Sequence, residues 1–219
     1  LWLRDTQADW SPLKKQMRNW LYYNYLSGDH IVEQAIHSID MMSWALGDVK
    51  PVSATGTGGR QSRVEPEYGN IYDHFGIVYE YESGTKGFHF SRQQKGCSNS
   101  YSVEMMGDNG HAMVDCVRDR HSIKGEADWR YRGESNDMYQ QEHDELFASI
   151  REGKPMNDGE WMAQSTMLGI MGRMVAYTGQ TITYEEALNS QQVLAPDDID
   201  DDTHIEDIGV AKPGITPFI

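Results

Sequence analysis

The chain contains 219 residues, of which 38% are hydrophobic and 24% are charged, a composition typical of a folded globular protein. Its 34 acidic and 19 basic side chains give a net charge of −15, which repels phosphate backbones, so no nucleic acid partner is expected. No apolar run approaches the roughly 20 residues that a membrane-spanning helix needs, and no membrane partner is expected. The chain begins with Leu1 rather than Met, so we expect a segment of a longer protein whose compartment is unknown.

The first predicted elements are an N-terminal arm and a helix. Residues 1–28 are rich in Trp and Tyr without regular spacing and predict an ordered loop or arm, with at most a short helical turn. From Asp29 to Leu46 the apolar spacing predicts a helix, with Asp29 as its N-cap and Gly47 as its end.

Residues 49–131 carry the signals of strands. Apolar and other residues alternate over residues 75–82, and Ser83-Gly84-Thr85 then predicts a turn into residues 87–90. Asp108-Asn109-Gly110 separates two further alternating runs, and Asn-Gly is a strong hairpin signal. Hairpins in series predict an antiparallel sheet of about six or more strands.

Helices return after the strands. We predict helices over residues 137–152 and 160–178, the second ending at Gly179, and a short helix over 184–190. Residues 196–219 contain an aspartate run and predict an acidic, extended, solvated tail, for which cation binding is the less favoured interpretation. The sequence therefore predicts an α+β domain over residues 29–195, with helices on one face of an open antiparallel-rich mixed β-sheet.

Four ionisable residues share one side of the predicted first helix. At about 100° per residue, His30, Glu33, His37 and Asp40 fall within an arc of roughly 80°, opposite the apolar side that should face the sheet. Glu33 and Asp40 can both reach His37, and a carboxylate beside an imidazole suits general acid/base chemistry near neutral pH. Two alternatives stay open, a solvated helix face with incidental ion pairs and a divalent metal site.

No cofactor-binding residue is expected in this chain. Residues 56–59 (Gly-Thr-Gly-Gly) resemble a phosphate loop only superficially, because Gln61 stands where the third glycine of that loop belongs. No strand–turn–helix pattern follows them either. We also predict no metal ligand set.

Residues 27–47 resemble the C-terminal domain of the Gfo/Idh/MocA family, the NAD(P)-dependent oxidoreductases typified by glucose–fructose oxidoreductase and inositol dehydrogenase. The family pattern has a Gly-rich approach, an acid four residues before a histidine, then His-x-x-Asp and a Trp/Leu-Gly ending. In this chain these are Glu33, His37, Asp40, Trp44 and Gly47. The resemblance covers roughly residues 15–190 and includes three further segments, namely Arg18-Asn19-Trp20, residues 147–155 and residues 172–180.

The resemblance implies a fold, a reaction and partners. It implies a glucose–fructose oxidoreductase C-terminal-domain-like fold, and a parent protein whose N-terminal Rossmann domain, absent from this chain, holds NAD or NADP. It implies oxidation of a secondary hydroxyl of a sugar or cyclitol, with His37 as proton acceptor and Glu33 and Asp40 orienting it. We expect His30, Arg18 and Trp20 to line the substrate site. The open sheet face implies a homo-oligomer, and the isolated chain should be inactive.

Two departures from the family pattern leave other functions open. The acid at position 33 is usually Asp in the family, and the position of His30 is usually not ionisable. A redox-neutral, NAD-assisted glycoside hydrolase or lyase is therefore an alternative. A non-catalytic sugar-binding or assembly module is another.

Overall fold

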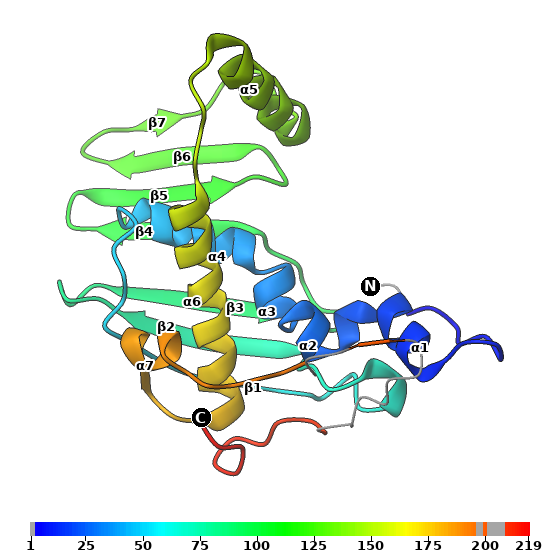
Figure 1. Ribbon diagram of the computed structural model, residues 1–219. Coiled ribbons are helices and arrows are strands. Elements are labelled where there is room, and N and C mark those ends of the chain that lie inside the picture. Colours follow the sequence, from blue (N-terminus) through cyan, green and yellow to red (C-terminus); the bar gives the residue numbers. More distant parts are fainter. Residues whose placement is uncertain (1–2, 196–198, 201–208) are drawn as a thin grey trace. The chain divides into compact units, whose positions relative to one another are not determined.

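The computed structural model describes residues 3–195, 199–200 and 209–219, which divide into two compact units (Figure 1). Unit 1 comprises Leu1–Cys97 and Gln164–Ile219, and unit 2 comprises Ser98–Ala163. Each unit carries its own four-stranded sheet, and every described strand pairing is antiparallel. The predicted α+β class and the antiparallel-rich sheet are confirmed, but the strands form two sheets rather than one.

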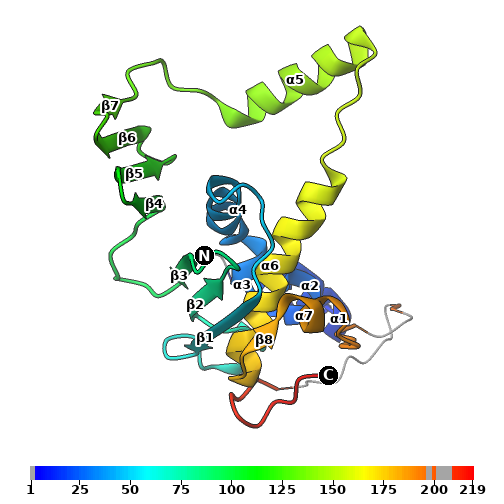
Figure 2. The same cartoon turned by 90° about the vertical axis from the view of Figure 1, so that its left-hand side faces the viewer.

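Sheet A, in unit 1, has the strand order β3-β2-β1-β8. Its strands are β1 (Ser53–Gly59), β2 (His74–Glu80), β3 (Lys86–Arg92) and β8 (Ile182–Thr183). The hairpin between β2 and β3 is the one that the turn at residues 83–85 predicts. Figure 2 shows the helices α3 (His30–Glu33), α4 (Ile36–Ala45) and α6 (Gly159–Thr178) on one side of this sheet.

The core of unit 1 lies between sheet A and these helices. Alternate residues of β2 point into it, as the two-residue period of a strand requires, and Ile77 and Tyr79 are fully buried there. Gly172 of α6 allows the close approach, because a Cβ at this position would lie 2.6 Å from the Tyr79 hydroxyl. The other fully buried members of this core are Ile31, Ile39, Leu168, Met171, Val175 and Ala176.

The N-terminal segment is more helical than predicted. It contains α1 (Pro12–Arg18), the 3-10 helix η1 (Trp20–Tyr22) and α2 (Asn24–Ser27), and Ser11 caps α1 through its side chain. A second small core holds this segment in place. It consists of Leu21, Tyr22 and Ile71, and η2 (Pro66–Tyr68) contributes Tyr68 to its edge.

Sheet B, in unit 2, has the order β4-β5-β6-β7. Its strands are β4 (Ser102–Gly107), β5 (Gly110–Asp115), β6 (Arg120–Gly125) and β7 (Trp129–Arg130), and the predicted Asn-Gly hairpin joins the first two. The helix α5 (Met138–Glu152) lies where a helix over residues 137–152 was predicted, with Asp137 as its N-cap and Gly153 as its C-cap. The short helix α7 (Tyr184–Leu188) belongs to unit 1 and begins with a capping box between Thr183 and Glu186.

The end of the predicted acidic tail belongs to unit 1 and contacts its core. Val210, Ala211 and Phe218 contact the main core, and the Ala211 carbonyl accepts a hydrogen bond of 2.9 Å from the Tyr72 hydroxyl. Residues 209–219 therefore contact the core at these positions, while most of their other side chains are exposed. Most of the aspartate run at residues 197–202 lies outside the described residues. Among the described helices, none has the length and apolar character that crossing a bilayer requires.

Candidate active site

The predicted first helix is broken in two. The segment α3 ends at Glu33, and α4 begins at Ile36. At the break the His30 carbonyl accepts from both the Gln34 and the Ala35 amides, at 3.1 and 2.9 Å, so one residue is inserted into the usual helical ladder. The prediction of one continuous helix over residues 29–46 is therefore wrong, and the four ionisable residues do not share one solvent-facing side.

Asp29 begins α3 and is fully buried. One carboxylate oxygen accepts from the His30 amide at 2.5 Å and lies 3.1 Å from His30 Nδ1. The other accepts from the Tyr72 amide at 2.7 Å and from the Tyr177 hydroxyl at 2.6 Å. Burial and the Asp29 charge raise the pKa of Tyr72 to about 12, and the same two causes place the pKa of Tyr177 far above its ordinary value. Both phenols therefore stay protonated and can donate.

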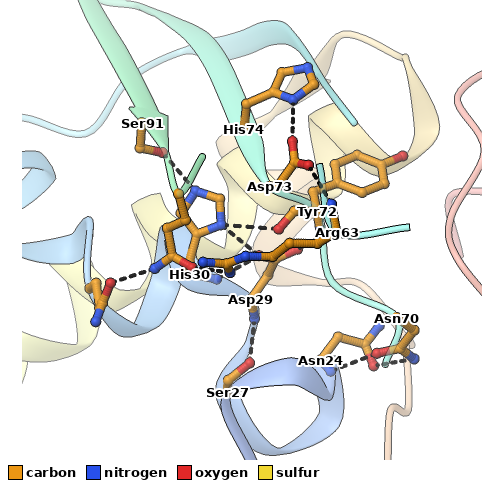
Figure 3. A network of polar contacts seen from close by, with 12 residues as sticks. Asn24, Ser27, Asp29, His30, Arg63, Asn70, Tyr72, Asp73, His74 and Ser91 are labelled. Carbon is orange, nitrogen blue, oxygen red and sulfur yellow. Dashed lines mark hydrogen bonds and ion pairs between the residues drawn. The ribbon is translucent and has the colours of Figure 1, made fainter. Parts of the chain in front are cut away.

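His30 is 1% exposed and belongs to the inner side of unit 1 rather than to a solvent-facing stripe. Its Nδ1 faces the Asp29 carboxylate and the Tyr72 carbonyl, at 3.1 and 3.3 Å (Figure 3). Both partners are acceptors, so we assign the proton to Nδ1. Nε2 then accepts from the Ser91 hydroxyl at 3.3 Å, while the ring lies edge-on to Phe75 with centroids 4.9 Å apart.

Glu33 and His37 are the two predicted catalytic residues that interact with each other. Burial raises the pKa of the Glu33 carboxyl, and the positive charges that His37 and His30 can carry lower it in part. Glu33 is half-buried, whereas His37 is exposed at the start of α4. A shielded carboxyl beside an accessible imidazole is an arrangement that can accept a proton from a bound molecule and stabilise the resulting imidazolium.

Asp40 faces α6. Its carboxylate accepts a short hydrogen bond from the hydroxyl of Ser165, which is 5% exposed. In the described part of the chain no hydrogen bond joins Asp40 to His37. Asp40 thus ties α4 to α6, and its predicted role in orienting His37 could act only through the position of that helix.

Arg18 and Trp20 lie on the N-terminal segment. Arg18 is exposed at the end of α1, and its guanidinium lies 5.8 Å from the centre of the Trp10 ring. Trp20 is half-buried in η1 and packs against the small core of Leu21, Tyr22 and Ile71. Their contact with a substrate stays a prediction.

Sequence reasoning did not select Asp73, His89 or Ser91 as site residues. Asp73 is fully buried and binds a loop: it accepts from the amides of residues 61–63 at 2.6–3.2 Å, and from His74 and Gln94 at 2.7 and 2.9 Å. His89 and Ser91 of β3 also lie on the inner side. Their signal was present in the sequence, because Phe88 and Phe90 alternate with them in the same strand.

Residues 56–59 do not form a phosphate loop. Residues 56–59 lie inside β1 and pair with residues 74–77 of β2, so they form no turn before a helix that could hold a pyrophosphate. Among the described residues there is also no group of three or more His, Cys, Asp or Glu side chains placed to hold a metal ion.

Comparison with known proteins gives one family match. The model of the GFO/IDH/MocA C-terminal domain matches residues 3–113. No functionally curated protein matches the sequence.

Several solved structures share the fold. Aldose-aldose oxidoreductase from Caulobacter crescentus, complexed with glycerol, superposes with a TM-score of 0.62 at 16% identity, over 75% of this chain and 50% of that one. UDP-N-acetylglucosamine 3-dehydrogenase from Acidithiobacillus ferrooxidans gives 0.58 at 15%, over 76% and 58%. Biliverdin reductase from Synechocystis, complexed with biliverdin and NADP+, gives 0.55 at 16%, over 72% and 49%. The chain thus spans about half the length of these proteins.

Proposed function

The chain belongs to the Gfo/Idh/MocA family, and on this premise we propose that it is the substrate-binding and catalytic domain of an oxidoreductase. The proposed reaction oxidises a secondary hydroxyl of a sugar or cyclitol, with NAD or NADP as the electron acceptor. The cofactor would be bound by a Rossmann domain elsewhere in the protein. The two solved relatives named for sugar substrates, the aldose-aldose oxidoreductase and the UDP-N-acetylglucosamine 3-dehydrogenase, support this class of substrate.

The observation that carries the proposal is the pair of Glu33 and His37. His37 is exposed and can meet a substrate, and a histidine imidazole can accept a proton. It would take the hydroxyl proton as the alcohol becomes a carbonyl. Glu33 lies close enough for their charges to interact, so its carboxylate would stabilise the protonated ring.

The remaining predicted residues would act around this pair. Trp20 offers an aromatic face on which the C–H side of a sugar ring can pack, and Arg18 offers donors for its hydroxyls. Asp40 would hold α4, and with it His37, through its bond to Ser165. His30 would act through Ser91, which it contacts directly.

The proposal includes two protein partners. One is the cofactor-binding domain, without which this chain should show no turnover. The other is a second copy of the protein, because the outer face of sheet A exposes Phe88 and Phe90 by 60% and 76%.

The test is cofactor reduction by the complete protein, followed optically over a panel of pyranoses, cyclitols and glycosides. His37→Ala should lower the rate at least about 100-fold, because general acid/base groups typically contribute 10²–10⁴. His143→Ala is the matched control, since His143 is also an exposed histidine but lies in unit 2. An unchanged rate in His37→Ala would contradict the assigned role.

Two other results would favour the alternative functions. Release of a free sugar from a glycoside without net cofactor reduction indicates the redox-neutral hydrolase or lyase. Sugar binding that survives His37→Ala, with neither reaction in the wild type, indicates a binding or assembly module.

A further inference from the structure

On the edge strand β3, the large apolar side chains face away from the helices that cover sheet A, and polar side chains face toward them. Phe88 and Phe90 point away from the helices and are exposed, whereas His89 and Ser91 point toward them. The strand register confirms these faces, since His89 pairs with the fully buried Ile77 and Ser91 with the buried Phe75. A polar inner face is informative, because burying polar groups is costly unless they are bonded.

Two residues of β3 and two of α3 form what we call the α3–β3 cluster: His89, Ser91, His30 and Glu33. Ser91 lies 3.3 Å from His30 Nε2, and both His89 and Glu33 interact electrostatically with His30. Helix α4 closes the same side, where a Cβ at Gly87 would meet the Met42 sulfur at 2.5 Å. The cluster is thus held between the edge strand and the helices that carry the Glu33–His37 pair.

Two buried atoms of this cluster have no hydrogen-bond partner within the described residues. They are Nε2 of His89, a residue only 5% exposed, and Oε2 of Glu33. Nearly all buried polar atoms in folded proteins are bonded, so these two atoms have hydrogen-bonding capacity left for a water molecule or a ligand hydroxyl.

The charge state of the cluster selects the kind of guest. Burial, and then the neighbouring His30, lower the pKa of His89 to about 4, so this ring is neutral near pH 7 and offers one donor and one acceptor. A neutral imidazole with one donor and one acceptor suits a hydroxyl group, and the net charge of −15 further disfavours anionic sugars such as sugar phosphates.

We propose that His89 and Ser91 bind a second hydroxyl group of an uncharged polyol substrate, next to the hydroxyl that His37 deprotonates. Asp29 and His30 are positioning residues in this arrangement. They fix Ser91 as a donor to His30, so that its oxygen faces the substrate as an acceptor. The inference rests on the proposed function, because it assumes that Glu33 and His37 mark the reacting end of the substrate.

The experiment compares binding and turnover by the complete protein. Calorimetry would use D-glucose, D-galactose and myo-inositol, followed by the monodeoxy analogues of whichever is bound. The wild type should bind one monodeoxy analogue about 10–100-fold more weakly than its parent, which is the effect of one lost hydrogen bond. His89→Leu should weaken binding of the parent by the same factor and bind that analogue equally well.

Two variants keep the test meaningful if His89→Leu does not fold. His89→Gln should retain part of the affinity, because the amide can replace the ring as donor and acceptor, and Ser91→Ala should show the same loss of discrimination. Tyr81→Phe is the matched control: it also removes a buried unpartnered oxygen on the inner face of sheet A, but outside the cluster, and should leave affinity unchanged.

The outcomes separate this inference from the proposed function. If the folded variants keep both affinity and discrimination, the cluster holds only water and the inference is overturned, whether or not the protein oxidises sugars. If they lose both while the wild type reduces no cofactor, the hydroxyl site stands and the oxidoreductase proposal fails. Binding of no sugar by the wild type overturns the inference.

Discussion

Asp29 combines a strained backbone with a dense set of hydrogen bonds. Its φ of 70° is uncommon for a residue other than glycine and costs about 1–3 kcal/mol. Four donors converge on its carboxylate, from His30 (two), Tyr72 and Tyr177, and charge-assisted bonds of this kind are strong enough to hold the conformation. Strain that is retained in this way is typical of sites whose geometry matters for function. In this chain it fixes the ring of His30.

Among the single residues, Asp73 gives the clearest expected pH dependence of the free energy of unfolding. Burial acts to raise the pKa of its carboxyl, but hydrogen bonds from His74, the Ser62 and Gln61 amides and Gln94 outweigh it and lower the pKa to about 2. The unfolded chain should titrate near 3.9. A carboxyl with a depressed pKa in the folded state stabilises the fold above the unfolded pKa, and this contribution is lost as the pH falls through the folded pKa.

We therefore expect Asp73 to contribute about 2 kcal/mol to the free energy of unfolding at pH 5. This contribution should be lost between about pH 4 and pH 2. Urea unfolding at a series of pH values, for the wild type and Asp73→Asn, measures it. The stability difference between the two proteins should shrink over this interval. Asp144→Asn, an exposed change on α5, is the control. Parallel curves for wild type and Asp73→Asn below pH 4 would show that the carboxyl is not perturbed.

At the level of elements, local sequence signals predicted where helices begin and end better than they predicted which residues are in contact. The helix α5 spans Met138–Glu152, which agrees with the helix predicted over residues 137–152. The break after α3 was not visible, because Gln34 and Ala35 are both compatible with a helix. The cap at Asp29 was predicted, but its partners were not. Tyr72 and Tyr177 lie 43 and 148 residues away in the sequence, beyond the reach of any periodicity argument.

The contact between α4 and α6 yields a prediction for this level. The bond from Ser165 to Asp40 is partly buried, so removing the hydroxyl leaves a carboxylate without its donor and should cost about 1–2 kcal/mol. A double-mutant cycle with Ser165→Ala and Asp40→Ala should give a coupling energy of about 1 kcal/mol. Urea unfolding of the four proteins provides the values.

The control for that cycle is Ser38→Ala, paired with the same Asp40→Ala. Ser38 is a half-buried serine of α4 whose hydroxyl donates to the Ala35 carbonyl within its own turn, so it should show no coupling. A coupling between Asp40 and Ser165 as small as that of the control would mean that the two helices are held by apolar packing alone.

For the whole molecule, the fold class followed from the sequence but the division into sheets did not. Alternation and turn residues define each hairpin, because neighbouring strands in the chain pair with one another. The pairing of β1 with β8 joins residues near 54 to residues near 182 and brings the end of α6 back to sheet A. The family resemblance indicated the candidate site, whereas the inner position of His89 and Ser91 needed the three-dimensional faces of β3.

The exposed outer face of sheet A leads to the last prediction, on self-association. Phe88 and Phe90 lie side by side with Val78 and Gly76 of β2 on that face, and exposed apolar patches on edge strands typically mark interfaces. We expect the protein to form an oligomer that Phe90→Ser weakens by tenfold or more in dissociation constant, as loss of a buried aromatic anchor does. Because each copy carries a charge of −15, mutual repulsion opposes assembly, so added salt should strengthen it.

Sedimentation velocity at 0.05 and 0.3 M salt measures both the effect of Phe90→Ser and the effect of salt. Met106→Ser, which alters an 82% exposed apolar side chain of sheet B, should leave the assembly unchanged. A monomer at all salt concentrations, or an oligomer equally sensitive to both substitutions, would exclude the outer face of sheet A as the interface.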